Sequence, residues 1–377
     1  MALSTWRGTL LGLCLVIGFL PTAGWTQDWP SVRGNQALSG SRVASIHVPL
    51  EKAWVTKTSE EISSAAVVAG GMVIFTCLDG SLWCLDASTG TVRWKTSLGT
   101  EAEATPLIDG SRIYVGNGDG MFFCLNTSDG KVLWTFTTDA KIAGGATIAR
   151  YKGRLLVLFG SYDRNLYCLD ANNGTKVWSF LAGNYINGTP ALEGERVIFG
   201  GCDGKLRILS LATGTELFML DAGTYVPASP AIQGKIAYAA TYAGKLLSFS
   251  TSTGRLIWST KPASEDSAFM GSPAVAGSFL VAGSKDGSVQ CFDTADGKKR
   301  WSFSTGDPVE SAPLIAGNTV LVASSDGWMY LLALETGKEL WSRELGGSSM
   351  ASPIVAGDMV FMGSPDGRMH AWQESKK

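Results

Sequence analysis

The chain has 377 residues, a formal net charge of −2 and only 17% charged residues. This near-neutral charge argues against a nucleic-acid partner, because proteins that bind nucleic acid carry clustered Lys and Arg. The only two histidines, His47 and His370, leave little room for a histidine-based metal site or a Ser-His-Asp triad. We expect His370 to be a packed residue rather than a ligand.

Residues 1–24 are predicted to be a secretory signal peptide. Arg7 is the one charged residue in this stretch, and it is followed by an apolar run at 9–20 and by small residues up to Gly24. This order is typical of a signal peptide, and the run is short for a bilayer span. We therefore expect an exported protein with no transmembrane span after cleavage. The alternative is an uncleaved N-terminal anchor.

An N-terminal arm, residues 25–50, comes next. It is rich in turn-forming residues and shows little hydrophobic periodicity, so we expect a loop. Directly after it, residues 50–55 (LEKAWV) look like the last strand of a repeat whose first three strands are missing.

The remaining chain repeats one unit with a period of about 40 residues. Residues 311–341 show the unit as four short apolar or alternating segments separated by turns. One turn contains Asp326-Gly327, and Asp-Gly supplies the positive φ that a tight hairpin requires. In each copy an aromatic residue stands four positions after a turn glycine: Gly90/Trp94, Gly130/Trp134, Gly174/Trp178, Gly214/Phe218, Gly254/Trp258, Gly297/Trp301 and Gly337/Trp341.

This period predicts an all-β fold, a β-propeller of four-stranded antiparallel blades. Seven internal aromatics and Trp54 give eight blades. The last repeat, from residue 349 onward, has three strands and no fourth. We expect the strand around Trp54 to complete it, because a closed ring has no open sheet edges. Residues 51–377 should then form a single domain.

Six cysteines remain after the signal peptide: Cys77, Cys84, Cys124, Cys168, Cys202 and Cys291. An even number in an exported chain invites a disulfide prediction. However, four of them occupy one equivalent slot in different blades, six residues before the turn glycine. Equivalent slots should lie about 10 Å or more apart, which is too far for a disulfide. We therefore expect buried free thiols.

The units CLDASTGTVRW (84–94), CLDANNGTKVW (168–178) and LLALETGKELW (331–341) resemble the repeat of pyrroloquinoline-quinone (PQQ)-type propellers. The resemblance covers about residues 50–377. It implies that the aromatic of each repeat slots between neighbouring blades as a tryptophan-docking residue. These residues are Trp54, Trp94, Trp134, Trp178, Phe218, Trp258, Trp301 and Trp341. The arm, with Trp29-Pro30 and Arg33-Gly34, is similar to segments that precede the first blade in exported members.

The PQQ-type family divides by function, so the fold alone does not choose an activity. One branch, the quinone-dependent dehydrogenases, implies bound PQQ, a calcium site of Glu, Asn and Asp, and commonly a disulfide between adjacent cysteines. This chain has no adjacent cysteines, is much shorter, and offers no carboxylates that can be matched to those ligands. We predict no catalytic residues, no metal site and no cofactor. The other branch, non-catalytic propellers of the BamB type, is similar in length and in its plain loops.

Four tyrosines in blades 3 to 5 form a candidate partner-binding arc. Tyr162 and Tyr242 fall in hairpins, and Tyr185 and Tyr225 fall in loops that enter a blade. All four should lie on one face, and Tyr is enriched at interfaces. The alternative is that they line the channel mouth. The same face carries acidic residues that would steer a basic partner segment toward it: Glu101, Glu103, Asp139, Asp266 and Glu310.

The function predicted from the sequence is an exported, monomeric, non-catalytic scaffold that binds other envelope proteins, in the periplasm or outside the cell. The first alternative is a PQQ-dependent oxidoreductase of reduced size. The second is a polysaccharide-binding propeller that uses the four tyrosines.

Overall fold

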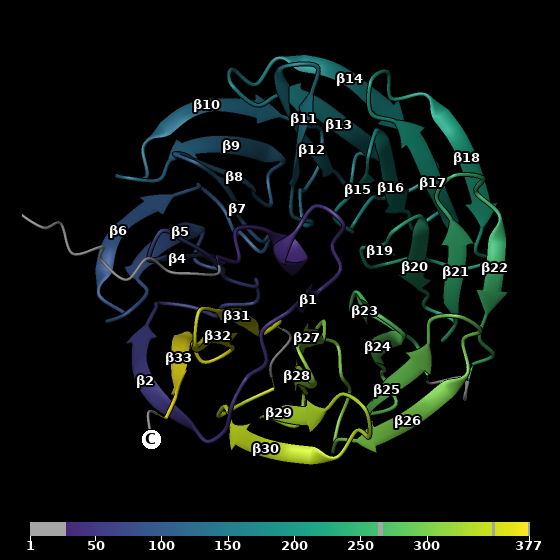
Figure 1. The fold of residues 1–377 in the computed structure, drawn as a ribbon. Helices are drawn as coiled ribbons and strands as arrows, with labels where there is room; N and C mark the ends of the chain where they lie inside the picture. The colour runs from purple at the N-terminus through teal and green to yellow at the C-terminus, as the bar shows by residue number, and fades with distance from the viewer. Residues whose placement is uncertain (1–27, 263–266, 349–350, 376–377) are drawn as a thin grey trace, which may run out of the picture.

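Eight four-stranded antiparallel blades are arranged in a ring around a central channel (Figure 1). This is a computed structural model, and it describes residues 28–262, 267–348 and 351–375. The predicted all-β, eight-bladed fold is confirmed. One short 3-10 helix, η1 (Val32–Gly34), lies at the centre of the ring. The predicted signal peptide lies outside the described residues, and within them no helix has the length and apolar character of a membrane span.

Each blade is a meander that begins at the channel and ends at the rim. Blade 1 consists of β3 (Val67–Ala69), β4 (Met72–Cys77), β5 (Ser81–Asp86) and β6 (Val92–Ser97), and blade 2 of β7 (Leu107–Asp109), β8 (Arg112–Gly116), β9 (Met121–Asn126) and β10 (Val132–Thr137). Blade 3 consists of β11 (Thr147–Tyr151), β12 (Arg154–Gly160), β13 (Asn165–Asp170) and β14 (Lys176–Leu181), and blade 4 of β15 (Ala191–Glu193), β16 (Arg196–Gly200), β17 (Lys205–Ser210) and β18 (Glu216–Asp221).

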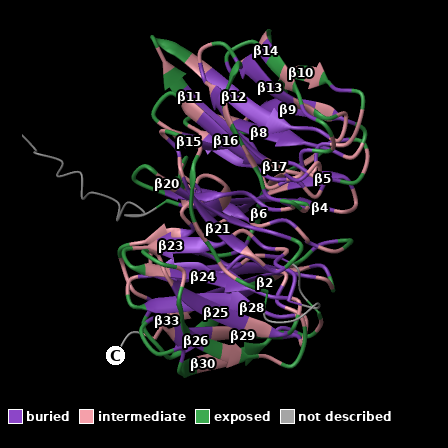
Figure 2. Cartoon of the chain, turned by 90° about the vertical axis from the view of Figure 1, so that its right-hand side faces the viewer, coloured by how far each residue is buried: buried purple, intermediate pink, exposed green. Residues whose placement is uncertain are grey.

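The second half of the ring repeats this pattern. Blade 5 consists of β19 (Ala231–Gln233), β20 (Ile236–Ala240), β21 (Leu246–Ser250) and β22 (Leu256–Ser259). Blade 6 consists of β23 (Ala274–Ala276), β24 (Phe279–Gly283), β25 (Ser288–Asp293) and β26 (Lys299–Ser304), and blade 7 of β27 (Leu314–Ala316), β28 (Thr319–Ala323), β29 (Trp328–Ala333) and β30 (Glu339–Glu344). The second strands are almost wholly buried between blades, whereas the outer strands alternate toward solvent (Figure 2).

The ring closes through blade 8, which takes strands from both ends of the chain. It contains β31 (Ile354–Ala356), β32 (Met359–Ser364), β33 (Arg368–Glu374) and, as its outer strand, β2 (Leu50–Lys57). The β2 strand pairs antiparallel with β33, from Leu50 opposite Glu374 to Lys57 opposite Arg368. This pairing matches the closure expected for the strand around Trp54.

The outer strand of every blade has a one-residue register shift directly before the aromatic of the repeat. Such a bulge bends the strand and increases its twist. Six of the aromatics are tryptophans whose Nε1–H donates to a carbonyl of the next blade, three residues before its turn glycine. The pairs, with N···O distances of 2.8–3.3 Å, are Trp54–Ala87, Trp94–Thr127, Trp134–Ala171, Trp178–Leu211, Trp258–Thr294 and Trp301–Leu334.

The turn glycine of the next blade lies directly beneath each of these rings. At Gly214, with φ of 69°, an added Cβ would come within 2.5 Å of the Trp178 ring. The two other aromatics make different contacts. Phe218 has no N–H to donate, but it approaches Gly254 equally closely, and Trp341 packs on the apolar core that contains Trp372.

The N-terminal arm is more than the plain loop that the sequence indicated. Its backbone runs inside the ring, and β1 (Ser41–Arg42) pairs in parallel with β27. Six inner strands donate a backbone N–H to it: Val68 to Trp29, Ile108 to Pro30, Leu192 to Gln36, Ile232 to Ala37, Val275 to Ser39 and Ile315 to Gly40. The Gln36 and Arg42 side chains reach Ile148 O and Gly357 O in the remaining two blades. The arm thus pairs backbone groups of inner edges that the blades alone leave open.

The six cysteines within the described residues are all free thiols, as expected. Five are buried and Cys202 is half-buried. Burial raises the pKa of the Cys84 thiol to about 12, which keeps it protonated and unreactive.

Candidate protein-interaction site

Loops and hairpins of blades 3 to 5 bring the four predicted tyrosines to one face of the ring. Strand direction alternates within a blade, so the hairpins between second and third strands share a face with the loops that link blades. We call this the hairpin face. Tyr162 lies between β12 and β13, Tyr185 between β14 and β15, Tyr225 between β18 and β19, and Tyr242 between β20 and β21.

Tyr162 and Tyr185 form a stacked pair, with ring centroids 4.9 Å apart and planes 7° apart. Backbone hydrogen bonds hold both residues, because Tyr162 N donates to Lys141 O and Cys202 N donates to Tyr185 O, each at 2.9 Å. Burial raises the pKa of the Tyr162 phenol, which remains a donor and bonds Asn187 Oδ1 at 2.9 Å. Tyr185 covers it and is 48% exposed.

Tyr225 and Tyr242 form the second pair, at a wider separation. Their centroids are 6.2 Å apart with planes tilted by 55°, and Tyr242 N donates to Tyr225 O at 3.0 Å. Both rings are about half exposed, at 54% and 46%. Asn187 connects the two pairs, because its Nδ2 donates to Pro227 O in the loop that carries Tyr225. The four tyrosines therefore belong to one hydrogen-bonded framework.

A depression of about 450 Å³ adjoins Tyr225, between the hairpin of blade 4 and the next blade-linking loop. Asp203, Cys202 and Gly204 are among the residues that line it. Burial raises the pKa of Asp203 and is the largest single effect, but the hydrogen bonds and charge of Arg207 together with the backbone N–H groups of Gly183 and Lys205 outweigh it, so the pKa is lowered. The Arg207 guanidinium contacts both carboxylate oxygens, at 3.1 and 2.6 Å, so this hairpin is fixed.

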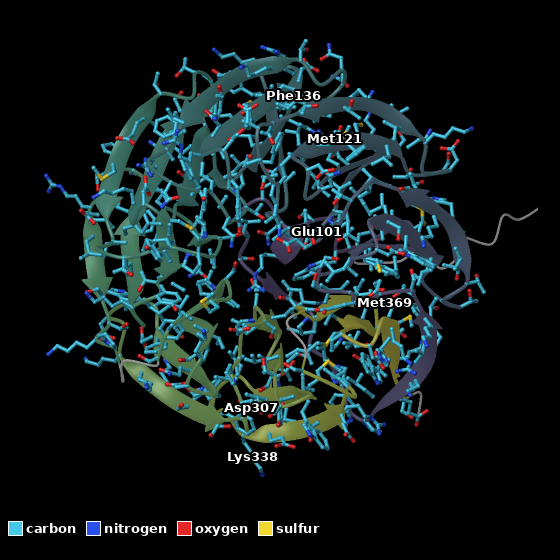
Figure 3. All side chains as sticks on the ribbon, turned by 180° about the vertical axis from the view of Figure 1, so that it is seen from behind. Glu101, Met121, Phe136, Asp307, Lys338 and Met369 are labelled. Carbon is cyan, nitrogen blue, oxygen red and sulfur yellow. The ribbon has the colours of Figure 1, made fainter. Side chains whose placement is uncertain are left out.

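The acidic character predicted for this face is partly neutralised. Lys141 Nζ lies 2.9 Å from Glu103 and 3.7 Å from Glu101, and Lys285 Nζ lies 3.9 Å from Glu310. Glu101 lies near the centre of the ring when the molecule is seen from behind (Figure 3). Asp139 is exposed, whereas Asp266 lies outside the described residues. Steering of a basic partner is therefore weaker than the sequence indicated.

The described residues do not bring together the carboxylates that the resemblance implies for a calcium site beside PQQ. They contain no group of three or more His, Cys, Asp or Glu side chains placed to hold a metal. The cavity beside Arg33 has a volume of about 160 Å³, below the roughly 300–1,000 Å³ of pockets for drug-sized ligands, whereas the depression beside Gln36 and Arg42 of the arm has about 950 Å³, within that range. The thiols are all unpaired in separate strands or loops. We assign no step of a reaction to these groups.

His370 is a packed residue of blade 8. Its ring stacks on Trp372 at 5.4 Å and its Nε2 lies 3.2 Å from the Ser364 hydroxyl. Burial, helped by nearby Lys52 and Arg368, lowers the pKa of His370 to about 4. His370 lines a surface depression together with Glu344. The Glu344 carboxylate is not among the groups that shift the pKa of His370.

This shift predicts a pH dependence of folding stability. Between pH 6.5 and 4 the unfolded chain binds a proton at His370 and the folded chain does not, so stability should fall as the pH falls. The loss should reach about 2 kcal/mol by pH 5. A His370→Phe variant, which keeps the aromatic stack, should lack this component. Urea unfolding at pH 7 and pH 5 measures the difference, and equal pH responses of the two proteins would contradict it.

The family model described as "Outer membrane protein assembly factor BamB" matches residues 23–161, 129–268 and 262–376. The three overlapping matches cover the arm and the whole ring. The chain belongs to this family. The three matches to the BamB-type model overlap because the chain repeats one unit, so a model that spans several blades can align with several stretches of the ring. A search of curated proteins finds no match to the chain.

Solved structures of several kinds share this fold. BamB from Moraxella catarrhalis is 19% identical, with a TM-score of 0.74 over 86% of this chain and 100% of that one. The computationally designed Ika8 protein is 18% identical, with a TM-score of 0.74 over 88% and 100%. Quinohemoprotein alcohol dehydrogenase from Comamonas testosteroni is 14% identical, with a TM-score of 0.77 over 95% and 82%. These likenesses show the fold alone.

Two residues of this region were not singled out from the sequence. Asn187 joins the two tyrosine pairs, and nothing in its surroundings, INGTP, indicated that role. The sequence places Arg33 only within a segment of family resemblance, yet its side chain is buried in the channel. The local sequence around Arg33 does not indicate that its side chain is buried, because the side chain donates to carbonyls of blades far along the chain, at Pro273 and Pro313.

Proposed function

We propose that the chain is an exported, non-catalytic scaffold of the cell envelope that binds a partner protein through the tyrosine arc. The observation that carries this proposal is the pair of half-exposed tyrosine clusters on one rigid framework. A partner would meet Tyr185, Tyr225 and Tyr242 already in place, so little conformational entropy is lost on binding. Interface energy usually concentrates in a few such aromatic anchors.

Membership of the BamB-type family supports this proposal, since its description names an assembly factor of an outer-membrane protein. Export follows from the predicted signal peptide at 1–24. The likeness to a quinohemoprotein dehydrogenase favours the competing oxidoreductase function. We give that function second place because the described residues contain no cluster of carboxylates for its calcium ion.

The test is the double variant Tyr185→Ala/Tyr225→Ala. Each change removes an exposed ring and keeps the backbone hydrogen bonds of the loop. We expect partner binding to weaken by about 2–4 kcal/mol, or roughly 30- to 1,000-fold, with the melting temperature nearly unchanged. The partner is captured from envelope extract with the intact protein, and its affinity for the parent and the variant is then measured.

The matched control is Thr213→Ala/Thr253→Ala, in exposed turns of blades 4 and 5 on the opposite face. This variant should bind the partner as the parent does. If both double variants bind like the parent, the tyrosines form only the rim of the channel. Incubation with PQQ and calcium, followed by dye reduction, tests the oxidoreductase function separately.

A further inference from the structure

Arg33 places a cation inside the channel, and none of the carboxylates in the described residues forms an ion pair with it. Its side chain is only 6% exposed, and one nitrogen, Nη2, donates to Pro273 O at 3.1 Å and to Pro313 O at 2.6 Å. Its Nε is buried and has no hydrogen-bond partner within residues 28–262, 267–348 and 351–375. Burial lowers the pKa of Arg33 to about 9, which leaves the group charged at pH 7. An unpaired buried charge is costly to the fold.

The cavity beside Arg33, of about 160 Å³, is lined by hydroxyl groups from several blades. Ser63 is one of the lining residues, and its Oγ is buried without a hydrogen-bond partner in the part of the chain that the structure describes. Ser272 Oγ accepts from Ser229 N at 3.1 Å, and Ser352 Oγ accepts from Ala312 N at 2.9 Å. A hydroxyl that accepts in this way keeps its own proton for donation. The cavity thus presents a guanidinium and several O–H donors.

We propose that this cavity is a binding site for one small carboxylate, held by Arg33 and by the hydroxyls of Ser63, Ser272 and Ser352. A carboxylate can accept from the guanidinium nitrogen that the Pro273 and Pro313 carbonyls leave free and from O–H groups at the same time. The volume equals that of about five waters, which is enough for a few heavy atoms. Glu103 also lines the cavity and pairs with Lys141; its remaining negative charge opposes any anion there and opposes a dianion such as phosphate more than a monoanion.

Two sources can supply such a group, a free small acid or the C-terminal carboxylate of a peptide. The lining residues precede the inner strands, at the end of the channel nearer the hairpin face, so a chain end could enter from that side. The site does not depend on the proposed scaffold role. Its ligand contacts come from the arm and from blades 1, 6 and 8, not from the tyrosines.

The test is titration of the purified protein with sodium acetate, with sodium chloride at equal ionic strength as the reference. We expect a saturable rise in melting temperature and a saturable broadening of the carboxylate signal of ¹³C-labelled acetate. Acetylated trialanine, as the free acid and as the amide, forms the second arm. Preference for the acid over the amide assigns the site to a peptide end, and binding of acetate alone assigns it to a free acid.

The variant Ser63→Ala should weaken binding roughly tenfold without loss of stability, because this hydroxyl makes no native hydrogen bond. Arg33→Met should abolish binding, although it also removes the bonds to Pro273 and Pro313. Arg42→Met is the matched control, because Arg42 lies in the same arm at the opposite mouth of the channel. Equal responses to acetate and chloride, or full acetate binding by both Ser63→Ala and Arg33→Met, would overturn the proposal.

Discussion

Deletion of residues 28–57 should leave no cooperatively folded monomer. The deletion removes β2 with buried Leu50 and with Trp54, which packs between Phe361 of blade 8 and the turn of blade 1, and it removes the arm with Trp29 and Leu38. Loss of a large buried side chain costs about 2–5 kcal/mol, so four of them match or exceed the roughly 5–15 kcal/mol by which domains are stable. Strand β33 would also become an open edge, which promotes association.

A shorter deletion, of residues 28–47, separates the two contributions. It keeps β2 and the closed ring but removes most of the hydrogen bonds between the arm and the inner strands. We expect a folded monomer with a lower melting temperature. Size-exclusion chromatography and thermal melts distinguish the outcomes. A monomer that lacks 28–57 and melts within a few degrees of the parent would contradict closure by β2.

Replacement of Gly214 by Ala should cost about 2–5 kcal/mol of folding stability. The backbone there has φ of 69°, and a left-handed alanine costs roughly 1–2 kcal/mol. The new Cβ would also lie 2.5 Å from Cε3 and 2.6 Å from Cδ2 of Trp178, and overpacking adds roughly 1–3 kcal/mol. The buried Trp178 ring cannot move without loss of its hydrogen bond to Leu211 O.

The control for this prediction is Gly194→Ala in the same blade. Gly194 has φ of 57°, but an added Cβ would meet nothing within 4 Å. Only the backbone cost should therefore appear, about 1–2 kcal/mol. Urea unfolding of both variants measures the difference. Equal losses at Gly214 and Gly194 would show that the tryptophan contact contributes nothing to the cost.

Most of the fold could be predicted from the sequence because each blade is built from local contacts. The Asp-Gly hairpins, the turn glycines and the aromatics four positions later recur at fixed spacing, so one unit predicts the others. The closure through Trp54 could also be predicted, because an orphan fourth strand and a missing fourth strand complement each other.

The arm could not be predicted in the same way. Its hydrogen-bond partners are single residues on successive inner strands, so its sequence carries no periodicity of its own. The burial of Arg33 depends on carbonyls more than two hundred residues away. The four tyrosines were found from composition and register, whereas their pairing and the bridge through Asn187 depend on how neighbouring loops pack.

The most direct test of the proposed function is site-specific photocrosslinking in intact cells. A photoreactive phenylalanine analogue is placed at position 185 or 225 on the hairpin face, and at position 213 or 253 on the opposite face. We predict that positions 185 and 225 crosslink to the same envelope protein and that positions 213 and 253 do not. Crosslinks from the opposite face alone, or none from positions 185 and 225, would contradict a scaffold that binds through the tyrosine arc.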